Sequence, residues 1–195
     1  GADIYLFSSY KTYGPHQGVM VIRKSATSVL EPQSHYFNRD VPSKWMTPAG
    51  PDHAQIAAMN GMLDYFDALD KHHGGSDDAM RPRRVETLFH TAERSNLKML
   101  LDYLGNRNDL RLLGPNDPER RAPTVSFVSS RHSSQDLGQK LADRKIMAGA
   151  GDFYAVRLLE TMGVSPEDGA VRLSFVHYTS PDEIKQAIAA LDDIL

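Results

Sequence analysis

From residue 53 onward, helix-type and strand-type apolar patterns alternate along the sequence, and this alternation constrains the fold more than any other feature. Apolar residues recur at helical spacing in some segments, whereas others are short apolar runs bounded by turn residues. Such a succession is typical of an α/β domain, in which strands pair into one small sheet and helices pack on it. The expected elements are helices 53–71 and 82–104, strands 110–113 and 124–128, helix 134–143, an extended piece at 146–148, helix 153–163, strand 171–176 and a helix from 181 onward.

The last of these helices carries the clearest start signal. Ser180 is a suitable N-cap, Pro181 fits the first helical position, and Glu183 is placed to complete a capping box. The apolar residues that follow recur at helical spacing and predict its buried face, which comprises Ile184, Ile188, Leu191 and Leu195.

The beginning of the sequence has a different organisation. Two short strands, residues 3–8 and 19–22, flank a segment with Lys11 near its start and a glycine-proline turn after it. Because the strand pattern starts at once, without a polar lead-in, we expect the chain to begin inside a larger fold.

Residues 25–52 are rich in Pro, Ser, Asn and Asp, and we expect them to form a long loop. Loops of such length within a compact domain tend to be functional. We expect the domain boundary near the start of the following helix, which gives two domains, residues 1–60 and 61–195.

Composition narrows the class of protein. Of the 195 residues, 41% are hydrophobic and 24% are charged, which is ordinary for a soluble globular protein. The formal net charge of −3 gives no electrostatic reason to expect nucleic acid or an anionic membrane as a partner. No apolar run approaches the roughly 18 residues of a membrane span, so a cytoplasmic enzyme is the default expectation. The lack of cysteine excludes disulfides, thiolate metal sites and a cysteine nucleophile in this chain.

The pattern around Lys11 allows two interpretations. Lysine is mostly exposed in proteins, so a plain surface lysine is the first. The second is a Schiff-base lysine at the end of a strand, whose amine must be neutral to react with a carbonyl and is brought to that state by burial or a neighbouring cation. In that case Ser8 could offer its hydroxyl to a phosphate.

A resemblance favours the second interpretation. Residues 3–19 closely resemble the cofactor-lysine segment of the class V aminotransferases and the SufS-type cysteine desulfurases. In that family a strand is followed by a serine, any residue, usually a histidine, the lysine, two residues and glycine-proline. The resemblance implies the fold type I of pyridoxal-phosphate enzymes. Residues 1–60 would be the end of the large cofactor-binding domain, and residues 61–195 the small C-terminal α/β domain, a mixed sheet with helices on it.

The resemblance also implies roles for residues before position 60. Lys11 would form the internal aldimine with pyridoxal 5′-phosphate and later move the α-proton of the substrate. Ser8 would bind the cofactor phosphate, and Tyr10 stands where desulfurases usually carry a histidine, from which its hydroxyl can reach the phosphate. Gly50 replaces a threonine that often contacts the phosphate of the partner subunit's cofactor, so only its backbone amide could serve. His53 would line the substrate site, or else face solvent at a helix start.

Two further roles follow from the resemblance. Tyr154 stands at or near the position of the catalytic cysteine of desulfurases, within a glycine, aspartate, phenylalanine, tyrosine run that cysteine-free members share. A phenol cannot accept sulfur as a persulfide, so sulfur transfer is not expected. Arg172 matches the arginine that binds the substrate α-carboxylate, for which a planar fork of donors is suited. Taken alone, Arg172 could equally be a salt-bridged surface arginine.

The implied function is that of a pyridoxal-phosphate enzyme acting on an amino acid as a homodimer, without a metal, nucleic-acid or membrane partner. Family members are longer, and their first half supplies further cofactor contacts, so we expect this chain alone to be inactive although its parent is an enzyme. One alternative is a non-catalytic α/β domain that folds or dimerises without a cofactor. Another is a cysteine desulfurase proper, which would require an external thiol.

Overall fold

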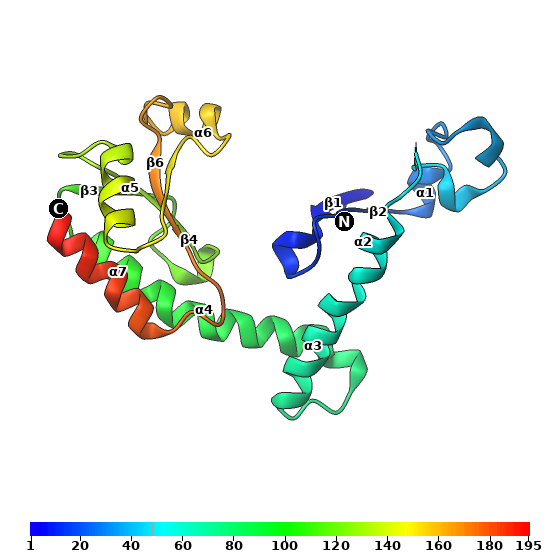
Figure 1. The fold of residues 1–195 in the computed structure, drawn as a ribbon, viewed down its shortest axis with the longest axis horizontal. Coiled ribbons are helices and arrows are strands. Elements are labelled where there is room, and N and C mark those ends of the chain that lie inside the picture. Colours follow the sequence, from blue (N-terminus) through cyan, green and yellow to red (C-terminus); the bar gives the residue numbers. More distant parts are fainter. Residues whose placement is uncertain (48) are drawn as a thin grey trace. The chain divides into compact units, whose positions relative to one another are not determined.

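The computed structural model describes residues 1–47 and 49–195 and divides into two compact units, Gly1–Val85 and Glu86–Leu195 (Figure 1). This division falls inside the long helix α4 (Arg81–Gly105), later than the domain boundary expected after residue 60, which stays a prediction. In the described part of the chain, no helix combines the length and apolarity that crossing a membrane requires.

The first unit begins with a β-hairpin. Strands β1 (Ile4–Ser8) and β2 (Gly18–Ile22) are antiparallel, and both agree with the predicted strands. In its described residues, the expected long loop contains only short pieces of regular structure, which are α1 (Lys24–Thr27) and the 3₁₀ turns Tyr36–Asn38 and Pro42–Lys44.

The predicted helix 53–71 is present as α2 (His53–Ala58) and α3 (Asn60–His72), with a turn at Met59 between them. Its apolar face is less buried than the pattern indicates, since Ile56 and Leu63 keep 46% and 51% of their surface exposed. Helical periodicity identifies the apolar face of a helix but does not show what covers it.

The connection from α3 to α4 is fixed by an ion pair. Arg84 donates from Nε and one terminal nitrogen to the two carboxylate oxygens of Asp70, at 2.6 Å each, and also to the carbonyl of Asp77 at 2.7 Å. This contact holds the pKa of the Asp70 carboxyl below its usual value. Gly75 has no room for a side chain, because a Cβ atom would stand 2.1 Å from an Asp70 carboxylate oxygen.

The second unit contains a four-stranded sheet in the order β3-β4-β6-β5. Its strands are β3 (Leu110–Leu113), β4 (Thr124–Ser129), β5 (Gly149–Gly151) and β6 (Ala170–Ser174). The α/β class and the helix-covered small sheet are confirmed. The expected mixed sheet differs, since every pairing among the described strands is antiparallel.

Three helices complete this unit, α5 (Ser134–Asp143), α6 (Val156–Thr161) and α7 (Pro181–Ile194). The predicted capping box of α7 is confirmed, with Ser180 and Glu183 bonded reciprocally. Two predicted elements are misplaced: the extended piece lies at Gly149–Gly151 rather than 146–148, and α6 spans Val156–Thr161 rather than 153–163. Strand β6 also ends at Ser174 rather than at 176. Phe153 and Tyr154 adopt positive φ angles of 52° and 59°, which a right-handed helix cannot contain.

The core of this unit lies between one face of the sheet and helices α4, α5 and α7 (Figure 1). Side chains alternate across a strand, so Val171 and Leu173 of β6 enter this core while Arg172 lies on the opposite face. On that opposite face, α6 covers a smaller apolar cluster. The main core comprises Leu97, Leu100, Leu101, Leu104, Leu110, Val125, Phe127, Leu137, Leu141, Val171, Leu173, Ile184, Ala190, Leu191 and Ile194.

Candidate active site

Lys11 lies on a turn of the hairpin in the first unit. Strand β1 ends at Ser8, and a 3₁₀ turn, Ser9–Thr12, follows before the chain bends at Tyr13 with a φ of 66°. Lys11 therefore lies in the loop that follows the strand, as its position in the sequence predicts, and is the third residue of this turn. The turn presents its side chain to the surface, where it is exposed.

Ser9 is the residue that fixes this turn. It is completely buried, and its hydroxyl contacts the carbonyls of Pro15 at 2.6 Å and Gln17 at 3.0 Å. Its own carbonyl accepts hydrogen bonds from the amide of Gly14 at 2.9 Å and the hydroxyl of Thr12 at 2.9 Å. Sequence reasoning singled out Ser8 and missed Ser9, although a serine directly after an apolar strand and before a glycine-proline turn is a signal for such a loop.

Gly14 allows the loop to close on Ser9. A Cβ atom at position 14 would stand 2.9 Å from the Cβ of Ser9 and 3.0 Å from its carbonyl oxygen. The glycine-proline turn is therefore required by packing, because any larger residue would displace the turn that carries Lys11.

The neighbours of Lys11 leave its amine available. The Tyr10 ring stacks on His16, with ring centroids 4.8 Å apart and planes 4° from parallel, and the Lys11 Nζ lies 5.6 Å from the Tyr10 centroid. Lys11 makes no ion pair with a carboxylate of the described residues. The hydroxyl of the half-buried Ser8 likewise has no hydrogen-bond partner among them. The phosphate-binding roles of Ser8 and Tyr10 stay predictions.

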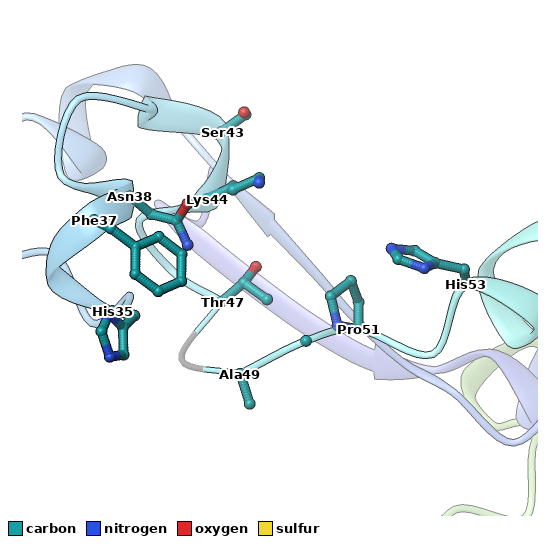
Figure 2. A pocket seen from close by; sticks show the side chains of 10 residues that line it. His35, Phe37, Asn38, Ser43, Lys44, Thr47, Ala49, Pro51 and His53 are labelled. Carbon is teal, nitrogen blue, oxygen red and sulfur yellow. The ribbon is translucent and has the colours of Figure 1, made fainter.

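Gly50 and His53 lie together at a second place in the first unit. Both line a hollow of about 520 Å³, and the imidazole of His53 projects from the start of α2 toward the segment that carries Lys44 (Figure 2). The His53 ring is also exposed to solvent, so both interpretations of this residue stay open. Neither residue's role is tested by this geometry alone.

In the second unit, Arg172 is supported by an aromatic ring. Its guanidinium carbon stands 4.0 Å from the centroid of the Phe153 ring, within the range of a cation–π interaction. On the neighbouring strand Gly149 pairs with Arg172, and a Cβ atom there would come within 2.7 Å of the Phe153 ring. Arg172 makes no ion pair with a described carboxylate, and its substrate-binding role stays a prediction.

Tyr154 is displayed by a tight turn next to this ring. The Asp152 carboxylate accepts a hydrogen bond from the Tyr154 amide at 2.9 Å, and the Asp152 carbonyl accepts one from the Ala155 amide at 2.8 Å. Phe153 and Tyr154 are consecutive left-handed residues without being glycine, a conformation that costs on the order of 1–3 kcal/mol for each and clusters at functional sites. The Tyr154 side chain is fully exposed, at 103%.

A contact that sequence reasoning missed anchors the segment after β6. The ring of His177 stacks on Phe89 of α4, with centroids 3.9 Å apart, and Asn96 Nδ2 donates to the Thr179 carbonyl at 2.7 Å. Burial lowers the pKa of His177 and raises the pKa of the nearby Glu93. These contacts tie the end of the Arg172 strand to the long helix.

The predicted site residues thus fall into three groups, each within one unit. Ser8, Tyr10 and Lys11 share the hairpin, Gly50 and His53 share the hollow, and Tyr154 lies on the turn whose Phe153 ring supports Arg172. No group of three or more histidine, aspartate or glutamate side chains suited to a metal ion occurs among residues 1–47 and 49–195.

Comparison with known proteins identifies the family. The aminotransferase class-V family model matches residues 85–187. An aminotransferase-like protein of Gibberella zeae is 30% identical over 100% of this chain and 46% of its own length. A probable cysteine desulfurase of Pseudomonas putida is 28% identical over 98% of this chain and 45% of its own.

A cysteine desulfurase structure from Thermococcus onnurineus NA1 has the same fold, with a TM-score of 0.81 at 21% identity, over 99% of this chain and 47% of that chain. The chain spans about half the length of both of these relatives. The family resemblance inferred from residues 3–19 is confirmed, and the family model covers more than half of the sequence. The chain belongs to the aminotransferase class-V family.

Proposed function

We propose that this chain is part of an enzyme that uses pyridoxal 5′-phosphate to transform an amino acid, with Lys11 as the amine that holds the cofactor. The observation that carries the proposal is the Lys11 turn itself. A buried serine and a required glycine build the turn, and the lysine it presents has no carboxylate partner in the described part of the chain. Such a fixed but unpaired amine suits covalent attachment to an aldehyde.

The donors near Lys11 fit the cofactor's phosphate. Ser8 offers an unengaged hydroxyl, and Tyr10 offers a phenol next to the lysine. Gly50 lines a separate hollow that does not include Lys11, and its backbone amide is the proposed donor to the phosphate of the partner subunit's cofactor. Hydroxyl, amide and ammonium groups are the donors that phosphate accepts. When bound, the pyridine ring would act as an electron sink for the substrate carbanion. Lys11 would then move the substrate α-proton as acid and base.

Arg172 is the proposed partner of the substrate carboxylate. The guanidinium carbon lies 4.0 Å from the centroid of the Phe153 ring, and this contact uses no carboxylate, so the N–H donors of Arg172 can serve a bidentate carboxylate. Tyr154 and His53 are the proposed lining of the substrate site. Since residue 154 is a tyrosine and the chain has no cysteine, the proposed reaction does not pass sulfur through a persulfide on this chain.

The chain covers about half of the aminotransferase-like relative and of the desulfurase structure described above, which favours an active protein longer than this chain. We expect residues 1–195 alone to be inactive. The active form would be a cytoplasmic homodimer, as the resemblance implies, and sedimentation velocity on the full-length protein would measure its oligomeric state.

Cofactor trapping tests the proposal. The full-length protein that contains this chain is mixed with pyridoxal 5′-phosphate, reduced with borohydride, digested, and analysed by peptide mass spectrometry. The expected result is one dominant pyridoxyl-modified peptide, with the modification on Lys11. It should disappear in Lys11→Ala and persist in Lys71→Ala, a matched exposed lysine on α3.

Labelling spread over many lysines, or none above background, would instead support the alternative of a non-catalytic α/β domain. Sulfide release from cysteine by the full-length protein would support a desulfurase that uses an external thiol.

A further inference from the structure

The space beside Arg172 is filled by a side chain from outside the strands. In the middle of β6, Arg172 pairs with Ser126 of β4 on one side and with Gly149 of β5 on the other. Gly149 contributes no side chain, and a Cβ atom there would meet two carbons of the Phe153 ring at 2.7 Å and 3.0 Å. Directly paired residues project from the same face of a sheet, so the Phe153 ring takes the cross-strand place next to Arg172 that a side chain of residue 149 would occupy.

Close packing fixes the strand that precedes this ring. A Cβ atom at position 138 of α5 would lie 2.8 Å from the Cβ of Ala150 in β5. At position 169, just before β6, a Cβ atom would collide with the backbone of Gly151. Glycine at both positions therefore lets β5 approach α5 and the start of β6 closely, which leaves little freedom in where the next residues begin.

The turn after β5 presents the ring. The Asp152 carboxylate accepts a hydrogen bond from the Tyr154 amide, and the Asp152 carbonyl accepts one from the Ala155 amide. Within this turn Phe153 has a φ of 52°, a region that favours glycine but holds a large aromatic residue here. Such backbone strain persists only where the surrounding structure imposes it, and it clusters at functional sites. The turn thus favours a smaller residue, whereas the place beside Arg172 is filled by the ring.

The ring restrains a cation without neutralising it. Arg172 is half-buried, its guanidinium carbon lies 4.0 Å from the Phe153 centroid, and no carboxylate in residues 1–47 and 49–195 forms an ion pair with it. An arginine side chain loses rotamer freedom when it binds a ligand, so a contact that restrains it beforehand reduces that loss. A carboxylate partner would restrain the side chain equally well but would occupy its N–H donors.

We propose that Phe153 is a positioning residue whose ring holds the Arg172 guanidinium, by a cation–π interaction, where it can receive a carboxylate. This role rests on the proposed function, which assigns the substrate carboxylate to Arg172. The proposal adds that residue 153 must be aromatic. An aliphatic side chain of similar size would fill the space over Gly149 but would not attract the cation.

Two probes that differ in one group test the role of Phe153. L-Alanine carries a carboxylate, and L-alaninamide carries an uncharged amide in its place. Each is titrated calorimetrically into the full-length protein loaded with pyridoxal 5′-phosphate. Phe153→Leu should weaken L-alanine binding by about two- to fivefold, which corresponds to the loss of a cation–π interaction at a partly exposed site, and should leave L-alaninamide binding unchanged. Phe153→Tyr keeps an aromatic ring and should bind both probes as wild type does.

Two control variants show whether the effect passes through Arg172. Phe175→Leu removes a half-buried ring that packs against the main core, on the other face of the sheet, and should leave the affinity for both probes unchanged. Arg172→Gln removes the cation, and in that background Phe153→Leu should weaken L-alanine binding no further.

Three results would overturn the proposal. The first is an unchanged L-alanine affinity in Phe153→Leu. The second is an equal loss for both probes in that variant, or a loss of the same size in Phe175→Leu, since either indicates a general structural effect. The third is a wild-type protein that binds the two probes equally or not at all. Pyridoxyl labelling of Lys11 is a separate readout: its absence refutes the proposed function, whereas labelling combined with an unchanged L-alanine affinity in Phe153→Leu refutes the role of Phe153 alone.

Discussion

Replacing Gly149 by alanine probes how Arg172 is supported. A Cβ atom at position 149 would lie 2.7 Å and 3.0 Å from two carbons of the Phe153 ring. Carbon atoms in ordinary contact stand roughly 3.5–4.0 Å apart, so the ring must retreat by about 1 Å. It cannot do so freely, because the turn at residues 152–155 holds Phe153 in a left-handed conformation.

The expected cost of Gly149→Ala is about 2 kcal/mol of unfolding free energy. Overpacking costs about 1–3 kcal/mol, and moving the ring from the guanidinium loses about 0.5–1 kcal/mol of cation–π attraction. Phe153 is only half-buried, so its ring can make part of this shift toward solvent although its backbone is held, and the total cost stays near the lower end of these ranges. In a Phe153→Ala background the collision is absent, and alanine should stabilise the strand by about 0.5 kcal/mol through reduced unfolded-state entropy.

A double-mutant cycle measures this difference. Urea denaturation followed by circular dichroism on wild type, both single variants and the double variant gives the coupling energy between positions 149 and 153. The structure predicts that the effect of Gly149→Ala changes sign with the background. Equal costs of this substitution in both backgrounds would refute the packing of Phe153 over Gly149.

Three further changes test other parts of the fold. Ser180→Ala removes the N-cap of α7 and should lower the unfolding free energy, measured by urea titration, by about 0.5–2 kcal/mol. An unchanged midpoint of urea unfolding would contradict the capping box. Ser9→Ala should lower the unfolding free energy by about 1 kcal/mol, because the carbonyls of Pro15 and Gln17 that its hydroxyl contacts still accept hydrogen bonds from backbone amides. It should also speed amide hydrogen exchange in the Lys11 hairpin, and unchanged exchange would contradict the anchoring role of Ser9. Arg84 lowers the Asp70 pKa, so the stability from this pair should be complete above about pH 4 and be lost as pH falls through the folded-state pKa. Arg84→Met should flatten that part of a melting-temperature profile against pH, and an unaltered profile would argue against the pair.

Much of the fold of the second unit could be predicted because its signals are local. Ser180, Pro181 and Glu183 determine the start of α7 within four residues, and Ser133 caps α5 as the predicted helix start requires. The error between residues 146 and 163 has the opposite cause. Phe153 and Tyr154 are ordinary helix or strand residues by propensity, and only the Asp152 turn and the surrounding packing give them positive φ angles.

The candidate site likewise has one part that could be predicted from the sequence and one part that could not. Lys11 could be found because its motif lies within one hairpin, and pairing from Ser8 to Gly18 closes it. The contact of Arg172 with Phe153 could not be predicted, because it depends on the register that pairs Gly149 with Arg172. The sequence pattern of these two strands does not specify which of their residues pair.

The cations of this chain differ in what holds them, and the difference bears on function. Arg84 and Arg107 pair with the carboxylates of Asp70 and Asp109, which occupy their donors and fix them as structural links. Lys11 and Arg172 instead lie next to the rings of Tyr10 and Phe153, without a described carboxylate partner. An aromatic ring attracts the cation through its face and accepts no conventional hydrogen bond from it, so the N–H donors remain available. A cation that must receive a ligand has to be positioned without being neutralised. Of these four cations, Lys11 and Arg172 meet that requirement, and they are the two to which the family resemblance gives catalytic and substrate-binding roles.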